Sequence, residues 1–91
     1  MKYVKYFGTN GLGYGYEDYE AYEDDDITEG EINEISDDRA LLFAEEYDYL
    51  AAQVAEEFDE TADYEEYYEA VLSMCGWEYI TEEEYKEYMG E

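Results

Sequence analysis

Carboxylates are the most numerous chemically active groups in this chain, and their spacing decides what they could do. The sequence has 29 Asp and Glu against four Lys and Arg, with no His, so its formal net charge is −25. Acids three or four positions apart on a helix lie about 5–6 Å from one another. This interval is close to that of successive phosphates on one nucleic-acid strand. Rows of such acids could therefore present a phosphate-like surface to a basic protein.

The candidate rows lie in the second half of the chain, where acids recur at helical spacing among apolar residues. The phosphate-like candidates are Glu45, Glu46, Asp48, Glu56, Glu57, Asp59, Glu60, Asp63, Glu65, Glu66 and Glu69. Tyr49 and Tyr67 lie among them. Because Tyr buries a large area at low entropic cost, both could anchor a partner protein, or could simply belong to the core. The rows could also be a solvated acidic face, as in halophilic proteins, but halophily would not explain 14 tyrosines.

Catalytic chemistry lacks the residues it needs. Nucleophilic catalysis requires a base beside the nucleophile, and without His only carboxylates are left for that role. A carboxylate pair could in principle cleave a glycoside, but among 29 acids some pair will have a suitable separation by chance. Cys75, the only cysteine, is expected to pack as a small apolar residue. We therefore expect no enzyme activity and no cofactor.

Two segments resemble ligand-binding motifs but fail the test of spacing. The run Asp24-Asp25-Asp26 suggests calcium, yet an EF-hand loop begun at Asp24 meets Glu29 where Gly is required and Ile35 where Glu is required. The glycines of residues 11–15 lack the Lys-Ser/Thr ending of a phosphate-binding loop. We therefore expect no dedicated metal site, and a hairpin around these glycines.

Composition indicates a folded chain, because 46% of the residues are apolar and 20% are aromatic, whereas acidic disordered chains are poor in both. A length of 91 residues supports one compact domain spanning 1–91. No apolar run approaches the length of a membrane span, and residues 1–7 do not resemble a signal peptide. A single cysteine fits a reducing compartment, so we expect a cytoplasmic protein. The anionic surface disfavours nucleic acid and membranes as direct partners and favours a protein with a basic groove.

The first 16 residues contain no acid, which predicts an interior element. Residues 1–7 are rich in Tyr, Val and Phe and are predicted to form a strand. Gly8–Gly11 has turn chemistry, and residues 12–22 are predicted to return as the second strand of a hairpin.

The remainder alternates helix signals with one short strand. Thr28 opens a capping box, and Ser36 offers a second cap, so residues 28–58 could form one helix or two. The strongest apolar periodicity runs from Ala40 to Phe58. A further helix is predicted over residues 62–74, capped by residues 59–61 and ended by Gly76, followed by a strand at 77–80 and a helix opened by the capping box at Thr81.

These elements predict an α+β fold of order β-β-α-α-β-α. The hairpin and the later strand are expected to pack against two or three acidic amphipathic helices. Helical spacing places Tyr47, Tyr64 and Tyr68 in the core.

In size, charge, tyrosine content and α+β layout, the whole chain resembles the small acidic inhibitors with which bacteriophages imitate DNA. These include anti-CRISPR proteins, which occupy the basic DNA-binding site of a Cas effector, and anti-restriction proteins, which block restriction–modification enzymes. The resemblance implies stoichiometric inhibition without chemistry in the cytoplasm of a bacterial host cell. We expect a monomer or homodimer. The alternative is an acidic, non-catalytic adaptor that binds a partner through its tyrosine-rich surface.

Overall fold

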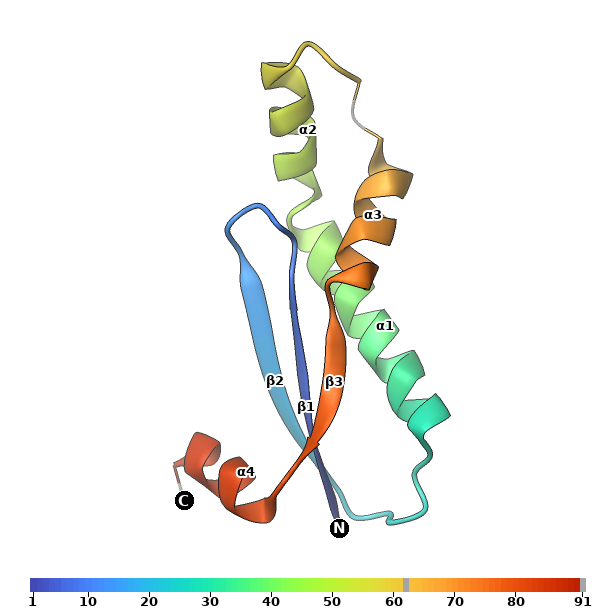
Figure 1. The fold of residues 1–91 in the computed structure, drawn as a ribbon, viewed down its shortest axis with the longest axis vertical. Coiled ribbons are helices and arrows are strands. Elements are labelled where there is room, and N and C mark those ends of the chain that lie inside the picture. Colours follow the sequence, from blue (N-terminus) through green and yellow to red (C-terminus); the bar gives the residue numbers. More distant parts are fainter. Residues whose placement is uncertain (62, 91) are drawn as a thin grey trace.

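A three-stranded antiparallel sheet forms the platform on which the helices pack (Figure 1). The structure is a computed structural model and describes residues 1–61 and 63–90. Their elements, in chain order, are β1 (Lys2–Thr9), β2 (Gly15–Tyr22), α1 (Glu29–Glu46), α2 (Asp48–Glu57), α3 (Tyr64–Ser73), β3 (Gly76–Ile80) and α4 (Glu82–Met89). The α+β class is confirmed, with one more helix than the predicted order.

β1 is the central strand, in sheet order β2-β1-β3. It pairs with β2 from Lys2↔Tyr22 to Thr9↔Gly15, and on its other edge with β3 from Tyr3↔Ile80 to Phe7↔Gly76. Val4 and Tyr6 are fully buried. The acid-free start of the chain is thus an interior element, as its charge predicts.

The hairpin turn lies later than the sequence predicts. Gly8 remains within β1, β2 begins at Gly15 and not at residue 12, and the connecting loop is residues 10–14. The Asn10 Oδ1 atom organises this loop by accepting a hydrogen bond from the Leu12 backbone N–H at 2.8 Å. Such a side chain replaces a backbone partner, and Gly11 follows it at a φ of +72°.

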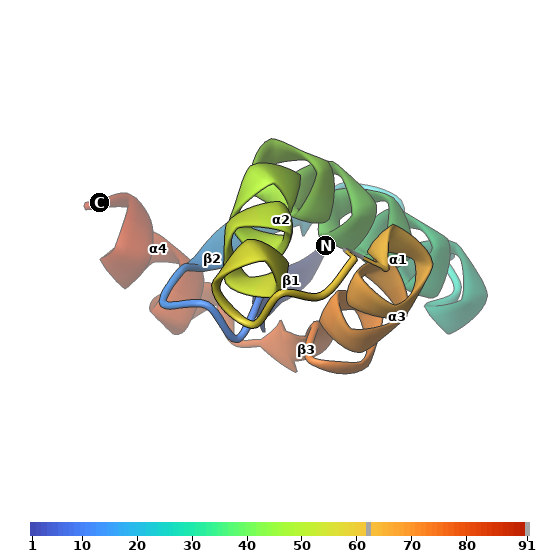
Figure 2. The same cartoon turned by 90° about the horizontal axis from the view of Figure 1, so that it is seen from above.

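α1 covers one face of the sheet. Its Ile32 packs on Val4 and Tyr6, and further along the same helix Phe43 and Ala44 pack against Val71 of α3. Viewed along the long axis, α1, α2 and α3 gather together while α4 stands apart (Figure 2). Side chains alternate along a strand, so Tyr3 points away from α1.

α4 packs on the sheet face opposite α1, at one end of the sheet. Its Tyr85 ring lies 5.0 Å from Tyr3, and its Tyr88 ring stacks 3.7 Å from Tyr19. The predicted cap is confirmed, because Thr81 Oγ1 accepts a hydrogen bond from the Glu84 backbone N–H at 3.1 Å.

Residues 28–58 form two helices, but the break lies at Tyr47 and not at Ser36. The predicted cap at Thr28 is confirmed, because its Oγ1 atom accepts from the Glu31 backbone N–H at 3.1 Å. Ser36 is buried within an uninterrupted α1. Tyr47 leaves helical geometry, with φ −116° and ψ 17°, while its ring stacks 4.5 Å from that of Tyr14. A contact with the hairpin loop therefore accompanies the bend.

α3 also differs from its predicted bounds. Its cap is Asp63, whose Oδ1 atom accepts from the Glu66 backbone N–H at 3.0 Å, and not residues 59–61. The predicted start at Ala62 lies outside the described residues. The predicted stop at Gly76 is wrong, because the helix ends at Ser73 and Gly76 begins β3. A tight turn ends the helix early, since the Met74 N–H donates to the Val71 carbonyl oxygen at 3.0 Å.

A substitution pair tests the packing at the centre of the fold. A Cβ at Gly8 would lie 2.1 Å from Cys75 Sγ, whereas a Cβ at Gly30, in the first turn of α1, would have Thr28 Oγ1 as its nearest neighbour, at 3.8 Å. We expect Gly8→Ala to lower the free energy of unfolding by about 2 kcal/mol through overpacking. We expect Gly30→Ala to raise it by about 0.5–1 kcal/mol, because Ala is the better helix former. Urea denaturation measures both, and a Gly8→Ala protein as stable as the parent would contradict the packing.

Candidate functional site

The basic side chains of this protein contact other parts of the same chain. Arg39 of α1 lies beside β2, where its Nη1 atom is 3.4 Å from Asp18 Oδ2 and its Nη2 atom donates to Glu20 Oε1 at 2.8 Å. Its guanidinium also lies over the Tyr6 ring, 4.3 Å from the centroid. Burial opposes the charged form of Arg39, but the hydrogen bond and charge of Glu20, together with Asp18, raise its pKa overall. Arg39 therefore ties α1 to an edge strand.

The remaining cations are also held by the chain. Lys5 lies 3.7 Å from Glu17 Oε1, on the sheet face opposite α1, and near the rings of Phe7 and Tyr19. The other contacts are Lys2 Nζ to the Ile27 carbonyl oxygen at 3.0 Å, Lys86 Nζ to Glu82 Oε1 at 3.0 Å, and the Met1 amino group to Asp25. The outward charge of the molecule is consequently almost all negative.

The acids lie on the surface, as a phosphate-like display requires. Among the described acids, Glu20 and Asp48 are partly buried and the others are exposed. The predicted candidates gather at one end of the long axis, on the last turn of α1, α2, the α2–α3 connection and α3 (Figure 1). They are Glu45 and Glu46 on α1, Asp48, Tyr49, Glu56 and Glu57 on α2, Asp59, Glu60 and Asp63 before α3, and Glu65, Glu66, Tyr67 and Glu69 on α3.

Some of these candidates have structural roles. Asp63 caps α3, and Asp48 Oδ2 accepts a hydrogen bond from the Tyr68 hydroxyl at 3.4 Å. The Tyr67 hydroxyl donates to the Ala44 carbonyl oxygen at 3.2 Å, and its ring packs in the core between α1 and α3. Burial raises the pKa of Tyr67. Tyr67 therefore stabilises the contact between α1 and α3, while Tyr49 is half exposed and presents its ring outward.

The structure also presents groups that the predicted rows leave out. Glu31, Glu34 and Asp38 are exposed along α1 at the same helical spacing, and this spacing alone could have identified them. The prediction of a core position for Tyr64 is wrong, because this side chain is exposed. Leu42 is exposed too, and it lies between the buried positions Ala40 and Phe43, off the apolar stripe.

Within 1–61 and 63–90, no group of three Cys, Asp or Glu side chains is arranged to hold a metal ion. In the acidic connector, Asp24 Oδ1 accepts from the Asp26 backbone N–H, and Asp25 pairs with the chain's amino group, which lowers the Asp25 pKa. A hollow of about 610 Å³ near the top of the hairpin has Glu17 as its one carboxylate, and that group faces Lys5.

The chain matches no protein-family model, no curated protein and no solved structure. Among the described residues, no helix combines the length and the apolar character needed to cross a membrane. The geometry of the acidic surface is accordingly the basis for inferring function.

A test of the internal cations compares Arg39 with Lys86. Arg39→Met removes two contacts to β2 and leaves their carboxylates without a cation, so we expect a loss of about 1–2 kcal/mol in unfolding free energy at low salt. The deficit should shrink at high salt, because screening weakens the remaining repulsion. Lys86→Met, at an exposed pair, should cost less than about 0.5 kcal/mol. Equal effects in urea denaturation would contradict the role of Arg39.

The free energy of unfolding should also fall at alkaline pH. Burial and the hydrogen bond to the Tyr22 hydroxyl raise the pKa of Tyr6 above its ordinary value of 10.0, and burial and Cys75 do the same for Tyr16. Groups with a raised folded-state pKa stabilise fully below the unfolded pKa and lose that contribution as pH rises toward the folded one. We expect the free energy of unfolding to fall above about pH 10. A Tyr6→Phe, Tyr16→Phe double variant should show a shallower fall, and an unchanged slope would contradict this origin.

Proposed function

We propose that the protein is an inhibitor that imitates nucleic-acid phosphates and blocks the basic DNA-binding site of a bacterial defence nuclease. A CRISPR–Cas effector is the first target to consider, and a restriction enzyme the second. The exposed carboxylates at the α2–α3 end would contact the target's Arg and Lys side chains. In an RNA-guided nuclease those side chains read the short PAM or hold the DNA strands.

The observation that carries this proposal is the density of fixed charge along the molecule. A net charge of −25 is distributed over a long axis of 50 Å, which is about one charge per 2 Å. Duplex DNA carries one negative charge per about 1.7 Å of axis. The protein therefore offers a basic groove nearly the same linear charge as its natural ligand.

The rigidity of the display also supports competition with DNA. Helices fix most of the candidate carboxylates, so a groove can bind them without first ordering a flexible chain. Internal pairing of the cations leaves little positive charge to repel a basic site. Attraction of this kind accelerates association and weakens as salt rises.

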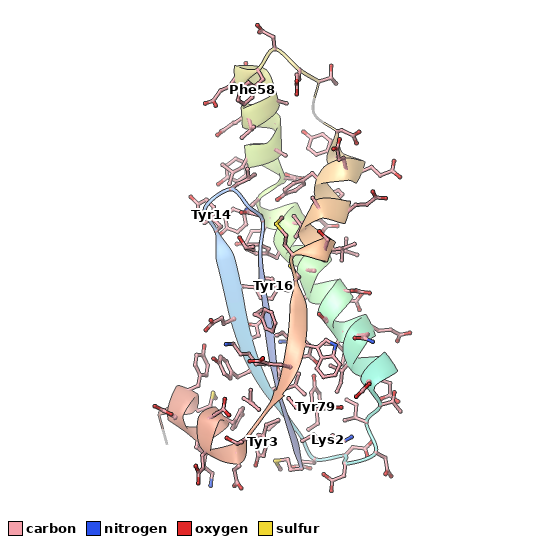
Figure 3. The ribbon with its side chains drawn as sticks, in the orientation of Figure 1. Lys2, Tyr3, Tyr14, Tyr16, Phe58 and Tyr79 are labelled. Atoms are coloured by element: carbon pink, nitrogen blue, oxygen red, sulfur yellow. The ribbon has the colours of Figure 1, made fainter. Side chains whose placement is uncertain are left out.

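A second candidate function is supported by an aromatic cluster. Tyr14 stacks on Tyr47, and the Tyr49 ring lies 6.4 Å from Tyr47, so aromatic rings gather beside the junction of α1 and α2. Tyr14 and Tyr49 are about half exposed, and Figure 3 shows Tyr14 at the hairpin end of the sheet. An adaptor that binds through this cluster would depend weakly on salt and would be impaired by Tyr14→Ala or Tyr49→Ala.

The first test is capture of partners from bacterial lysates that contain Cas effectors and restriction enzymes, followed by a challenge with duplex DNA or salt. We expect a nuclease that both agents displace. A partner that stays bound in excess duplex DNA would contradict mimicry and favour the adaptor.

A charge-removal variant tests which acids make the contact. Replacement of Glu56, Glu57, Glu65 and Glu66 by Gln preserves shape, and we expect it to weaken inhibition of the captured nuclease at least tenfold, because each residue loses a charge-assisted contact. The matched control replaces four exposed glutamates elsewhere, Glu31, Glu34, Glu83 and Glu87, and should change inhibition much less. Undiminished inhibition by the first variant would contradict the proposed contact surface.

A further inference from the structure

α2 leaves its apolar side only partly covered. No residue of this ten-residue helix is buried. An isolated helix of that length is marginal in water, so its apolar side is expected to gain from a partner. Ala51, Val54 and Ala55 instead line an open groove of about 290 Å³, with Tyr67 and Ala70 of α3 on the other wall.

The groove is preformed. The hairpin loop contributes Leu12 to the groove lining, and the Leu12 backbone N–H donates to the Oδ1 atom of buried Asn10. The Tyr67 hydroxyl donates a hydrogen bond to the Ala44 carbonyl oxygen, and this contact holds α3, one side of the groove, against α1. A site that is already ordered loses little entropy when a partner binds.

The apolar stripe continues beyond the groove. Phe58 follows Val54 by one helical turn and is highly exposed, at the end of α2 farthest from the sheet (Figure 3). Residues four apart lie on the same helix face, so Phe58 extends the stripe that Val54 begins.

Carboxylates border this apolar groove and define the chemistry of its occupant. Glu60, Asp63 and Glu66 are among the lining residues, and all three are exposed. A molecule that binds here must therefore offer apolar side chains to the groove lining and cations to the bordering carboxylates. A second copy of the chain would place like-charged borders against each other, and an anionic lipid or nucleic acid would meet the same repulsion.

We propose that the groove between α2 and α3 binds a basic amphipathic helix of a partner protein. Apolar residues of that helix at positions i, i+3 or i+4, and i+7 enter between the two helices, and its flanking Lys and Arg side chains pair with the bordering carboxylates. α2 is about 15 Å long, so the occupant contributes about three turns. This contact goes beyond phosphate imitation, because its main contribution is apolar burial, which salt does not screen.

Two synthetic peptides of 15 residues, made only of Leu and Lys, test the proposal with the full chain. One has Leu at helical spacing on a single face, and the other has the same composition with Leu distributed around the helix. We expect both to bind at 20 mM NaCl, because the protein is a polyanion. At 500 mM NaCl the amphipathic peptide should bind at least tenfold more tightly in isothermal titration calorimetry. Equal affinities at 500 mM NaCl would overturn the proposal.

Matched variants locate the binding surface. Val54 and Phe58 are 38% and 69% exposed, and Leu41 and Leu42 on α1 are 37% and 67% exposed. We expect Val54→Asn with Phe58→Asn to weaken binding of the amphipathic peptide about tenfold at 500 mM NaCl, and Leu41→Asn with Leu42→Asn to change it less than twofold. Circular dichroism confirms that both proteins are folded. Equal losses would overturn the assignment.

Two further outcomes separate this site from its alternatives. A dimer in sedimentation at 500 mM NaCl that dissociates in the Val54→Asn, Phe58→Asn protein would make a second copy the occupant and overturn the proposal. Replacement of Glu56, Glu57, Glu65 and Glu69 by Gln removes phosphate-like candidates that do not line the groove. Peptide binding that survives in this variant, while competition with DNA is lost, supports a groove that acts independently of mimicry. If the variant loses selective peptide binding but still competes with DNA, the proposed groove site is overturned and phosphate mimicry is not.

Discussion

Mutual repulsion among the carboxylates is the constraint on which the rest of this structure depends. With nearly every described acid exposed, the interior has to be built from segments that carry few of them. The acid-free β1 occupies the centre of the sheet, with Val4 and Tyr6 fully buried. Because most of the chain must reach solvent, the molecule is long and thin, at 50 × 28 × 15 Å. The same shape distributes the charge along an axis.

Few cations are available to offset this repulsion, and the fold uses them as ties between elements. Arg39 joins α1 to β2, and Lys2 joins β1 to the connector that leads into α1. Tyr6, Tyr22 and Tyr67 complete the interior, since each packs a large ring there while its hydroxyl keeps a polar partner. The hydroxyls of Tyr6 and Tyr22 lie 2.8 Å apart, and that of Tyr67 reaches a helix carbonyl. Folding and an anionic exterior are therefore compatible in a single small chain.

Sequence patterns predicted the features that depend on residues close together in the chain. They did not predict features that depend on contacts between distant parts of the chain. Caps at Thr28 and Thr81, the hairpin and the buried first strand follow from short-range chemistry and charge. The bend at Tyr47 does not, because it coincides with stacking on Tyr14, 33 positions earlier in the chain. Periodicity identified Val54 and Phe58 as apolar positions of a helix. It could not tell a stripe that the fold covers from one that it leaves open, since both have the same spacing.

The free edge of β2 is a place where two copies of the protein could pair at high concentration. An uncovered edge strand can recruit a strand from another molecule and begin aggregation. On β2, Glu17, Asp18 and Glu20 would each be brought beside the acids of an incoming copy. β3, at the other edge, is only five residues long and carries Glu78. The acids of these strands thus oppose edge-to-edge pairing of two copies, and we expect them to disfavour cross-β assembly of this tyrosine-rich chain.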